Sequence, residues 1–145
     1  MSSSEIRVVR VVRAFAASAE RVFGAWLDPA MAKRFLFVTN NGEIVTAEID
    51  ARVGGRFRII RRDDRDVEHV GTYLEIDRPR KLVFTFAVPA FSLAETLVTI
   101  DIVTAAGGCE LTLTHQHVLP EWVDSTQQGW SSILAALDHT LSSTA

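Results

Sequence analysis

Two histidines near the end of the segment LTLTHQHVLPEW (residues 111–122) are the side chains of this chain best suited to chemistry. A neutral imidazole can bind a metal, transfer a proton or hydrogen-bond to a ligand. His115 and His117 are two residues apart, and on a strand such side chains point to the same face. Three interpretations follow for the pair: hydrogen-bonded polar groups at a strand end, anchors for a polar group of a ligand, or metal-binding and acid–base groups.

A metal site or a catalytic centre needs more groups than this pair supplies. A catalytic zinc usually has three protein ligands, and the other two histidines, His69 and His139, belong to other predicted elements. Cys109 is the single cysteine, which excludes an internal disulfide and a cysteine-based zinc site. The pair Gly54-Gly55 precedes a predicted strand rather than a helix, which argues against a phosphate-binding loop. We therefore predict no bound metal and no cofactor, and we assign no catalytic residue.

The composition predicts one globular domain over residues 1–145. Of the 145 residues, 48% are hydrophobic and 23% are charged, as in ordinary soluble domains. The formal net charge of -3 gives no positive field that would attract nucleic acid or an anionic membrane. We interpret the basic segment RFRIIRRDDR (residues 56–65) as exposed strand faces and a turn, because acids interrupt it. The sequence has neither a membrane-spanning run nor a signal-peptide pattern, which predicts a cytoplasmic protein without membrane insertion.

The elements that position the histidine pair follow from the sequence pattern. Residues 6–15 are rich in β-branched side chains and predict a strand. Ser18 is predicted to cap a helix over residues 19–27, and Pro29 suits the first turn of a second short helix. From residue 43 onward, apolar side chains recur at every second position, and turn sequences separate six strands. The histidine pair ends the last of these strands.

The end of the chain predicts a long amphipathic helix over residues 125–142. Ser125 and Gln128 match a capping box at its start. Its apolar stripe comprises Val123, Gln127, Trp130, Ile133 or Leu134, Leu137 and Leu141. Gly129 interrupts the helix at a cost of about 1 kcal/mol relative to alanine, which indicates a packing or cavity requirement at that position.

The arrangement of these elements follows from their connections. Six strands joined by short turns predict an antiparallel meander. The long helix must bury its apolar stripe, and the concave face of the sheet is the only large apolar surface that the pattern offers. The predicted fold class is therefore α+β, with a curved antiparallel β-sheet wrapped around a long C-terminal α-helix.

An ordered set of segments resembles a known family. These segments are RAFAASAERVFGAWLDPAMAKRFL, VGGRFRI, GTYLEIDRPRKLVFTF, ELTLTH and a late GW followed by ILAALDHTL. They resemble bacterial domains related to the C-terminal domain of the activator of the heat shock protein 90 ATPase, over about residues 6–141. The resemblance implies the helix-grip fold of the START-like (SRPBCC) superfamily, with a cavity between the sheet and the C-terminal helix. That superfamily includes lipid carriers, aromatic polyketide cyclases and co-chaperone domains, so the fold alone does not assign a function.

Aromatic side chains from the predicted helices and strands converge on the central space beside the histidine pair. The predicted ligand-binding residues are Trp26, Phe35, Phe57, Tyr73, Phe84, Phe86, His115, His117, Trp130 and Leu134. From this set we predict an enclosed apolar pocket with His115 or His117 as its polar anchor. The residues expected to line this pocket are Trp26, Phe57, Tyr73, Phe84 and Trp130.

The leading functional hypothesis is a non-catalytic protein that binds a small hydrophobic, aromatic or lipid-like ligand. One alternative is a cyclase-like enzyme on an aromatic polyketide substrate, with His115 or His117 as acid or base. A second alternative, which the resemblance implies, is a chaperone-associated protein-interaction module with a role in the stress response. The sequence is compatible with a protein partner and with an oligomer, and it predicts no nucleic-acid partner.

Overall fold

A computed structural model describes residues 8–38, 42–90 and 92–143 of the chain. Its elements in chain order are β1 (Val8–Phe15), α1 (Ala19–Leu27), α2 (Pro29–Phe35), β2 (Glu43–Ile49), β3 (Arg56–Arg62), β4 (Asp66–Asp77), β5 (Lys81–Val88), β6 (Ser92–Ala105), β7 (Gly108–Gln116), a 3-10 turn (Pro120–Trp122) and α3 (Val123–Ser143). Seven strands form one antiparallel sheet in the order β1-β7-β6-β5-β4-β3-β2. The predicted α+β fold class and the predicted meander are confirmed.

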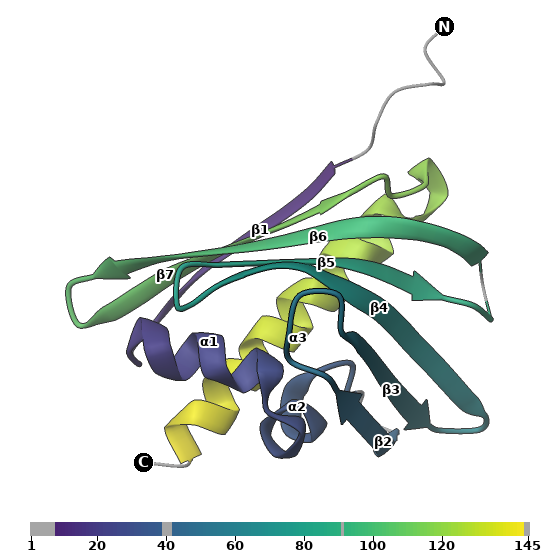
Figure 1. Cartoon of the computed structure of the whole chain (residues 1–145), viewed down its shortest axis with the longest axis horizontal. Coiled ribbons are helices and arrows are strands. Elements are labelled where there is room, and N and C mark those ends of the chain that lie inside the picture. Colours follow the sequence, from purple (N-terminus) through teal and green to yellow (C-terminus); the bar gives the residue numbers. More distant parts are fainter. Residues whose placement is uncertain (1–7, 39–41, 91, 144–145) are drawn as a thin grey trace, which may run out of the picture.

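All three helices lie on the same face of the curved sheet, and α3 runs across it (Figure 1). The first strand, β1, joins the sheet beside the last strand, β7, and places Val9 opposite His115. On its other side β7 pairs with β6, where Val98 is the partner of His115. His115 therefore lies inside the sheet rather than at an edge, although it is close to the end of its strand.

The starts of the helices follow local sequence signals in two cases out of three. The hydroxyl of Ser18 accepts a hydrogen bond from the backbone N–H of Arg21 at 3.2 Å, which confirms the predicted cap of α1. Asp28 caps α2, which has Pro29 in its first turn as predicted. The predicted capping box of α3 is wrong, because the hydroxyl of Ser125 instead donates to the carbonyl of Trp122 at 3.2 Å. The 3-10 turn leads directly into α3, which therefore begins two residues earlier than predicted.

The core lies between the concave face of the sheet and the helices. Trp130, Leu134 and Leu137 of α3 are at most 3% exposed, as the helical stripe predicts. Gln127 is exposed, so the stripe begins later in the helix than predicted. On β5 the inward-facing side chains Leu82 and Phe84 are buried, whereas Phe86, next in the alternation, is only half-buried. The packing is therefore unequal along the length of the sheet.

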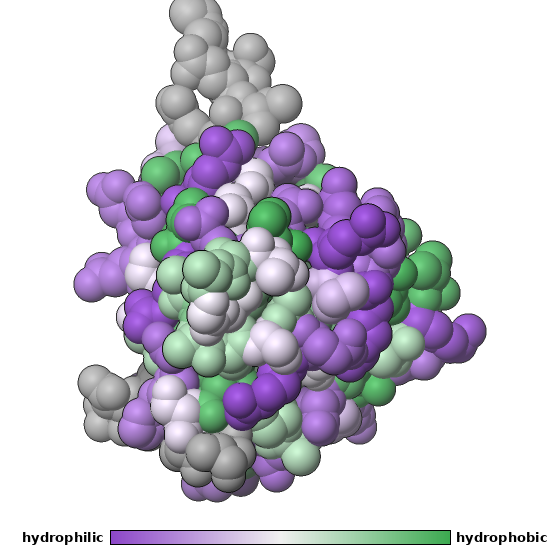
Figure 2. Space-filling model, turned by 90° about the vertical axis from the view of Figure 1, so that its left-hand side faces the viewer, coloured by the Kyte–Doolittle hydropathy of each residue, from purple (hydrophilic) through white to green (hydrophobic). Residues whose placement is uncertain are grey.

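The outer surface mixes polar and apolar side chains. On the face that Figure 2 shows, hydrophilic residues surround isolated hydrophobic ones and an area of intermediate hydropathy. Within the described ranges, none of the helices has the length and hydropathy that a membrane span requires.

Candidate ligand-binding site

One end of the interior is closely packed with aromatic rings. We call it the filled end, and its residues are Trp26, Phe35, Phe57, Tyr73 and Phe84. The rings of Phe57 and Phe84 meet edge to face at 5.3 Å between centroids, and Trp26 meets Phe35 in the same way at the same distance. The void left between these rings has a volume of about 10 Å³, which is room for at most about one water molecule. The filled end is core.

The other end of the interior is open. A cleft of about 430 Å³ lies between the sheet and the first half of α3, and we call it the aromatic cleft. Its lining residues are Phe37, Val38, Arg61, His69, Phe86, Val88, His115, Thr126, Gly129, Trp130, Ser132 and Ile133. This volume falls within the range that is typical of sites for small organic ligands.

A smaller space, which we call the side pocket, adjoins the aromatic cleft. Its volume is about 190 Å³. It is lined by Phe86, Ala87, Val88, Thr96, His115, His117, Val118, Leu119, Trp122 and Thr126. Four lining residues are common to the two spaces, namely Phe86, Val88, His115 and Thr126. The two spaces therefore lie side by side, with these four side chains between them.

The cleft exists because α3 presents small side chains there. Gly129 and Ser132 line it, and a Cβ atom built on Gly129 would meet no other atom within 4 Å. In Figure 1, α1 and α2 lie beside the C-terminal half of α3, and the N-terminal half extends beyond them. The inward-facing rings of the sheet are therefore covered by helices at the filled end and left accessible at the cleft.

His115 is held by hydrogen bonds at both ring nitrogens. The indole N–H of Trp130 donates to Nδ1 of His115 at 3.0 Å. Nε2 of His115 lies 2.6 Å from the hydroxyl oxygen of Thr96, and that hydroxyl donates its proton to the carbonyl of Phe86 at 2.8 Å. A hydroxyl has a single proton to donate, so it accepts from Nε2–H of His115. His115 is therefore the neutral tautomer protonated at Nε2.

The environment of His115 keeps it neutral at pH 7. Burial, with a smaller contribution from nearby His117, lowers the pKa of His115 to about 4. A second proton at Nδ1 would face the indole N–H of Trp130, where two donors would meet. Of the three interpretations of the histidine pair, this geometry corresponds for His115 to the hydrogen-bonded polar group, and its main partner is a ring of the cleft.

His117 does not share the position of His115. The strand β7 ends at Gln116, and His117 follows with a positive φ of 69° and an exposed side chain. The expectation that both histidines share one strand face is wrong, because the left-handed backbone breaks the alternation after Gln116. His117 lines the side pocket but not the aromatic cleft. In the part of the chain that the structure describes, no three His, Cys, Asp or Glu side chains are grouped to hold a metal.

His69 lines the cleft, although the sequence analysis assigns it no role. Its Nδ1 lies 3.2 Å from the carbonyl of Ile59, so this nitrogen carries the proton and Nε2 is the acceptor. The imidazole stacks on the ring of Phe37 at 4.2 Å with an interplanar angle of 8°, and Phe37 stacks in turn on Phe86 at 5.2 Å. Burial, with a smaller contribution from the charge of Arg61, lowers the pKa of His69 to about 4.

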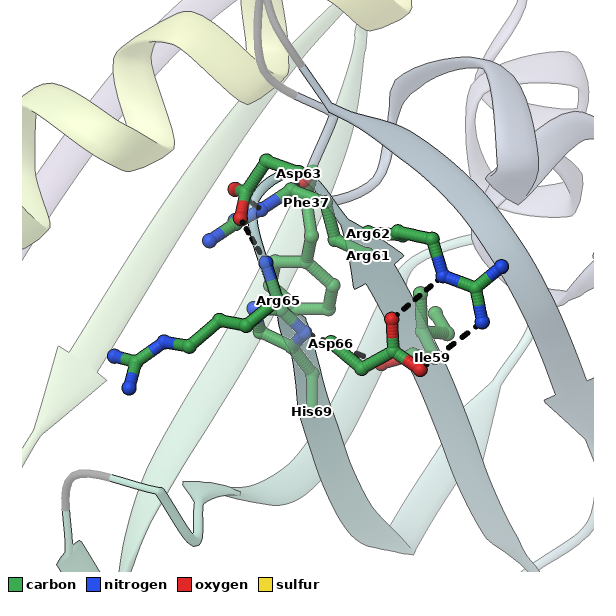
Figure 3. A network of polar contacts seen from close by, with 8 residues as sticks. All are labelled: Phe37, Ile59, Arg61, Arg62, Asp63, Arg65, Asp66 and His69. Atoms are coloured by element: carbon green, nitrogen blue, oxygen red, sulfur yellow. Dashed lines mark hydrogen bonds and ion pairs between the residues drawn. The ribbon is translucent and has the colours of Figure 1, made fainter.

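Arg61 is the second cleft residue that the sequence interpretation missed. Its Nε donates to Asp63 at 3.2 Å, and its Nη1 donates to the carbonyl of Phe37 at 3.4 Å (Figure 3). The side chain of Arg61 is 18% exposed, whereas that of Arg62 is 59% exposed and pairs with Asp66. The interpretation of this segment as exposed strand faces and a turn is therefore wrong for Arg61.

A sequence signal for both missed residues existed. Side chains two apart on a strand share a face, and Arg61 follows the buried Phe57 and Ile59 of β3 at this spacing. His69 likewise lies between the buried Val67 and Tyr73 of β4 in the same alternation. Continuing this alternation from the buried neighbours predicts that Arg61 and His69 both point toward the interior.

The comparisons with known proteins identify the family and the fold. A family model described as activator of Hsp90 ATPase homolog 1-like protein matches residues 16–142. The chain belongs to this family. No curated protein matches the chain.

Solved structures of similar fold come from several bacteria. Protein CV1439 from Chromobacterium violaceum is 23% identical, with a TM-score of 0.83 over 91% of this chain and 94% of that chain. An AHSA1-like protein from Aeromonas hydrophila is 19% identical, with a TM-score of 0.81 over 95% of this chain and 94% of that chain. Protein SA2116 from Staphylococcus aureus, described as of unknown function, is 16% identical, with a TM-score of 0.86 over 97% and 96% of the two chains. At these identities the likeness shows the helix-grip fold, and the predicted family and fold are confirmed.

In this member of the activator of Hsp90 ATPase homolog 1-like family, the predicted ligand-binding residues divide between the filled end and the aromatic cleft. Those that line the aromatic cleft are Phe86, His115 and Trp130. Those that surround the void of the filled end are Trp26, Phe57, Tyr73 and Phe84. Phe35 packs on Trp26, and Leu134 is fully buried in the core. The single enclosed pocket expected from the sequence is therefore replaced by a filled core and a separate open cleft, because the large rings occupy the first space themselves.

Proposed function

We propose that this member of the activator of Hsp90 ATPase homolog 1-like family is a non-catalytic binding protein for small apolar ligands with aromatic rings. The observation that carries the proposal is the aromatic cleft, a space of about 430 Å³ in which Phe37, Phe86 and Trp130 meet. The centroids of Phe37 and Phe86 each lie about 6 Å from that of Trp130, at 5.9 and 6.0 Å. Such rings offer faces and edges for an aromatic ligand.

The expected affinity follows from the apolar surface that a ligand would bury. Burial of about 200 Å² of ligand surface contributes roughly 5 kcal/mol at 25 cal/mol per Å². Binding also requires loss of ligand motion, which offsets part of this gain. Since about 4.1 kcal/mol corresponds to 1 mM, an aromatic ligand of two or three rings should therefore bind with a dissociation constant of roughly 0.2–1 mM.

The histidines support binding better than acid–base catalysis. A general base needs a free lone pair within reach of the substrate and a pKa near the working pH. Both ring nitrogens of His115 are already bonded to Trp130 and Thr96, and its pKa is lowered to about 4. His69 has its pKa lowered to about 4 as well. These features fit groups that shape a cleft and accept hydrogen bonds.

The test uses the fluorescent neutral probe N-phenylnaphthylamine, whose emission increases in an apolar site. Thr126 lines both the cleft and the side pocket, whereas its neighbour Gln127 is exposed and lines neither. Thr126→Phe adds volume to the site, and Gln127→Phe adds the same ring to the solvent side of α3. We expect the parent protein and Gln127→Phe to bind the probe within twofold of each other. Thr126→Phe should weaken binding by about tenfold or more, since an overfilled site costs more than 1 kcal/mol.

The proposal fails in either of two cases. One is a parent protein that produces no saturable increase in probe emission. The other is an equal loss of binding in Thr126→Phe and Gln127→Phe, which would place the probe on the surface of α3. Thermal unfolding of both variants shows whether they are folded at the temperature of the titration.

A further inference from the structure

The aromatic cleft has one ionised side chain among apolar and neutral polar ones. Among the described residues that line it, Arg61 is the sole acidic or basic group that carries a charge at neutral pH, since His69 and His115 are neutral there. The acidic partner of Arg61, Asp63, lies on the turn after β3 and is not part of the lining. An apolar cleft with a single cationic group is complementary to an anion that carries an apolar body.

The contacts of Arg61 leave part of its guanidinium available. A guanidinium has five N–H donors in a planar fork. In the described structure Nε donates to Asp63 and Nη1 donates to the carbonyl of Phe37, as Figure 3 shows. These two bonds hold the group in place and do not use Nη2. A carboxylate or sulfonate can accept a charge-assisted hydrogen bond from such a fixed group.

The two spaces differ in polarity along their length. Arg61 and His69 line the aromatic cleft but not the side pocket. Val118, Leu119 and Trp122 line the side pocket but not the cleft. A ligand with one anionic end and one apolar end therefore has a single favourable orientation, with its apolar end toward the side pocket.

We propose that the aromatic cleft selects aromatic anions, with the carboxylate or sulfonate bound by Arg61 and the rings held among Phe37, Phe86 and Trp130. This inference rests on the proposed function, because a cleft that binds no apolar ring gives Arg61 nothing to select. The neutral His69 adds no second charge, so Arg61 alone carries the preference for an anion.

Two probes that differ by one group test this selection. Anilinonaphthalene sulfonate is N-phenylnaphthylamine with a sulfonate on its ring system, and the emission of both increases in apolar sites. The protein variants are Arg61→Gln and the matched control Arg62→Gln, which removes the same charge from the adjacent, exposed position. We expect Arg61→Gln to weaken binding of the sulfonate probe by about tenfold, the value of one charge-assisted hydrogen bond. It should leave the neutral probe within twofold, and Arg62→Gln should change neither probe by more than twofold.

The outcomes separate this inference from the proposed function. Failure of the parent to bind the neutral probe overturns the proposed function and this inference with it. Normal binding of the neutral probe, with equal effects of Arg61→Gln and Arg62→Gln on the sulfonate probe, overturns this inference alone. Arg61→Gln could abolish binding of both probes by displacing Phe37, and in that case Arg61→Lys is the deciding variant. If Arg61→Lys retains more affinity for the sulfonate probe than for the neutral probe, the inference is supported. If it loses affinity for both probes equally, the inference is overturned.

Discussion

The filled end and the aromatic cleft lie under the same sheet and are both lined by aromatic rings, yet only one of them has space for a ligand. The void at the filled end is about 10 Å³, against about 430 Å³ for the cleft. At the filled end, the rings of β3 and β4 each meet a ring of β5 edge to face, and the rings of α1 and α2 meet each other in the same way. At the cleft, the rings of Phe37 and Phe86 line the same space as the small residues Gly129 and Ser132 of α3. The number of aromatic residues does not decide where a cavity forms; the size of the side chains opposite them does.

Trp130 has ring neighbours in both regions. Its ring lies 6.3 Å from that of Trp26 on the side of the filled end, and 6.0 Å from that of Phe86 on the side of the cleft. The hydrogen bond to His115 fixes the direction of its indole. His115 therefore orients a ring that lines the cleft.

The largest expected difference in stability and in probe binding is between two truncations, one at the filled end and one at the aromatic cleft. Phe84→Ala at the filled end should lower the free energy of unfolding by about 3–5 kcal/mol, because the ring is fully packed. Phe86→Ala at the cleft should cost less than half as much, because Phe86 is only half-buried. Denaturant unfolding measures both values. Under conditions where both variants are folded, the neutral probe should bind Phe84→Ala like the parent and bind Phe86→Ala at least about fivefold more weakly, since a wall of the site is lost. The reverse pattern would place the site at the filled end.

Between pH 7.5 and 5, the dependence of stability on pH should come mainly from the cleft, where both buried histidines lie. Their folded pKa values of about 4 are below the ordinary value of 6.5. Between these values the unfolded chain binds more protons than the folded one, so stability is complete above pH 6.5 and falls as the pH falls toward 4. Between pH 7.5 and 5 each histidine should account for about 2 kcal/mol of the loss.

Variants of the single histidines measure this contribution. His69→Gln and His115→Gln should each reduce the difference in unfolding free energy between pH 7.5 and 5 by about 2 kcal/mol relative to the parent. The control is His139→Gln, at an exposed position of α3, which should leave the difference unchanged. If neither His69→Gln nor His115→Gln reduces the difference in unfolding free energy between pH 7.5 and 5, both imidazoles are solvated rather than packed.

The smallest expected effect is a gain in stability at Gly129. This residue lies in α3 at an exposed position beside the cleft, and an added Cβ would meet no atom within 4 Å. Gly129→Ala should therefore raise the free energy of unfolding by about 0.5–1 kcal/mol through helix propensity alone. The same variant should weaken binding of the neutral probe only slightly, by about twofold or less. A loss of stability would show that the backbone at Gly129 is not in an ordinary helical conformation.

The sequence was sufficient for the sheet, the long helix and the buried faces, because alternation of period two and helical spacing report directly on burial. It was not sufficient to separate the filled end from the cleft. That distinction depends on the volumes that face each other across the interior, for example Phe84 against Trp26 and Phe86 against Gly129, and no period in one segment encodes it.

Two backbone conformations account for further differences between the sequence interpretation and the structure. Phe37 and His117 are the described non-glycine residues with positive φ, at 63° and 69°. Residues other than glycine rarely adopt this region, so sequence patterns give little warning of it. The ring of Phe37 lines the aromatic cleft. The turn at His117 moves its imidazole off the strand face, and it lines the side pocket instead. Both residues therefore line the candidate site.

A crystal structure of the protein grown with N-phenylnaphthylamine tests the central claim most directly. The account expects electron density for the rings of the probe between Phe86 and Trp130 on one side and Gly129 and Ser132 on the other, with the hydrogen bond from Trp130 to His115 intact. Density for the probe among Trp26, Phe57 and Tyr73, or a collapsed and empty cleft under saturating probe, would contradict it.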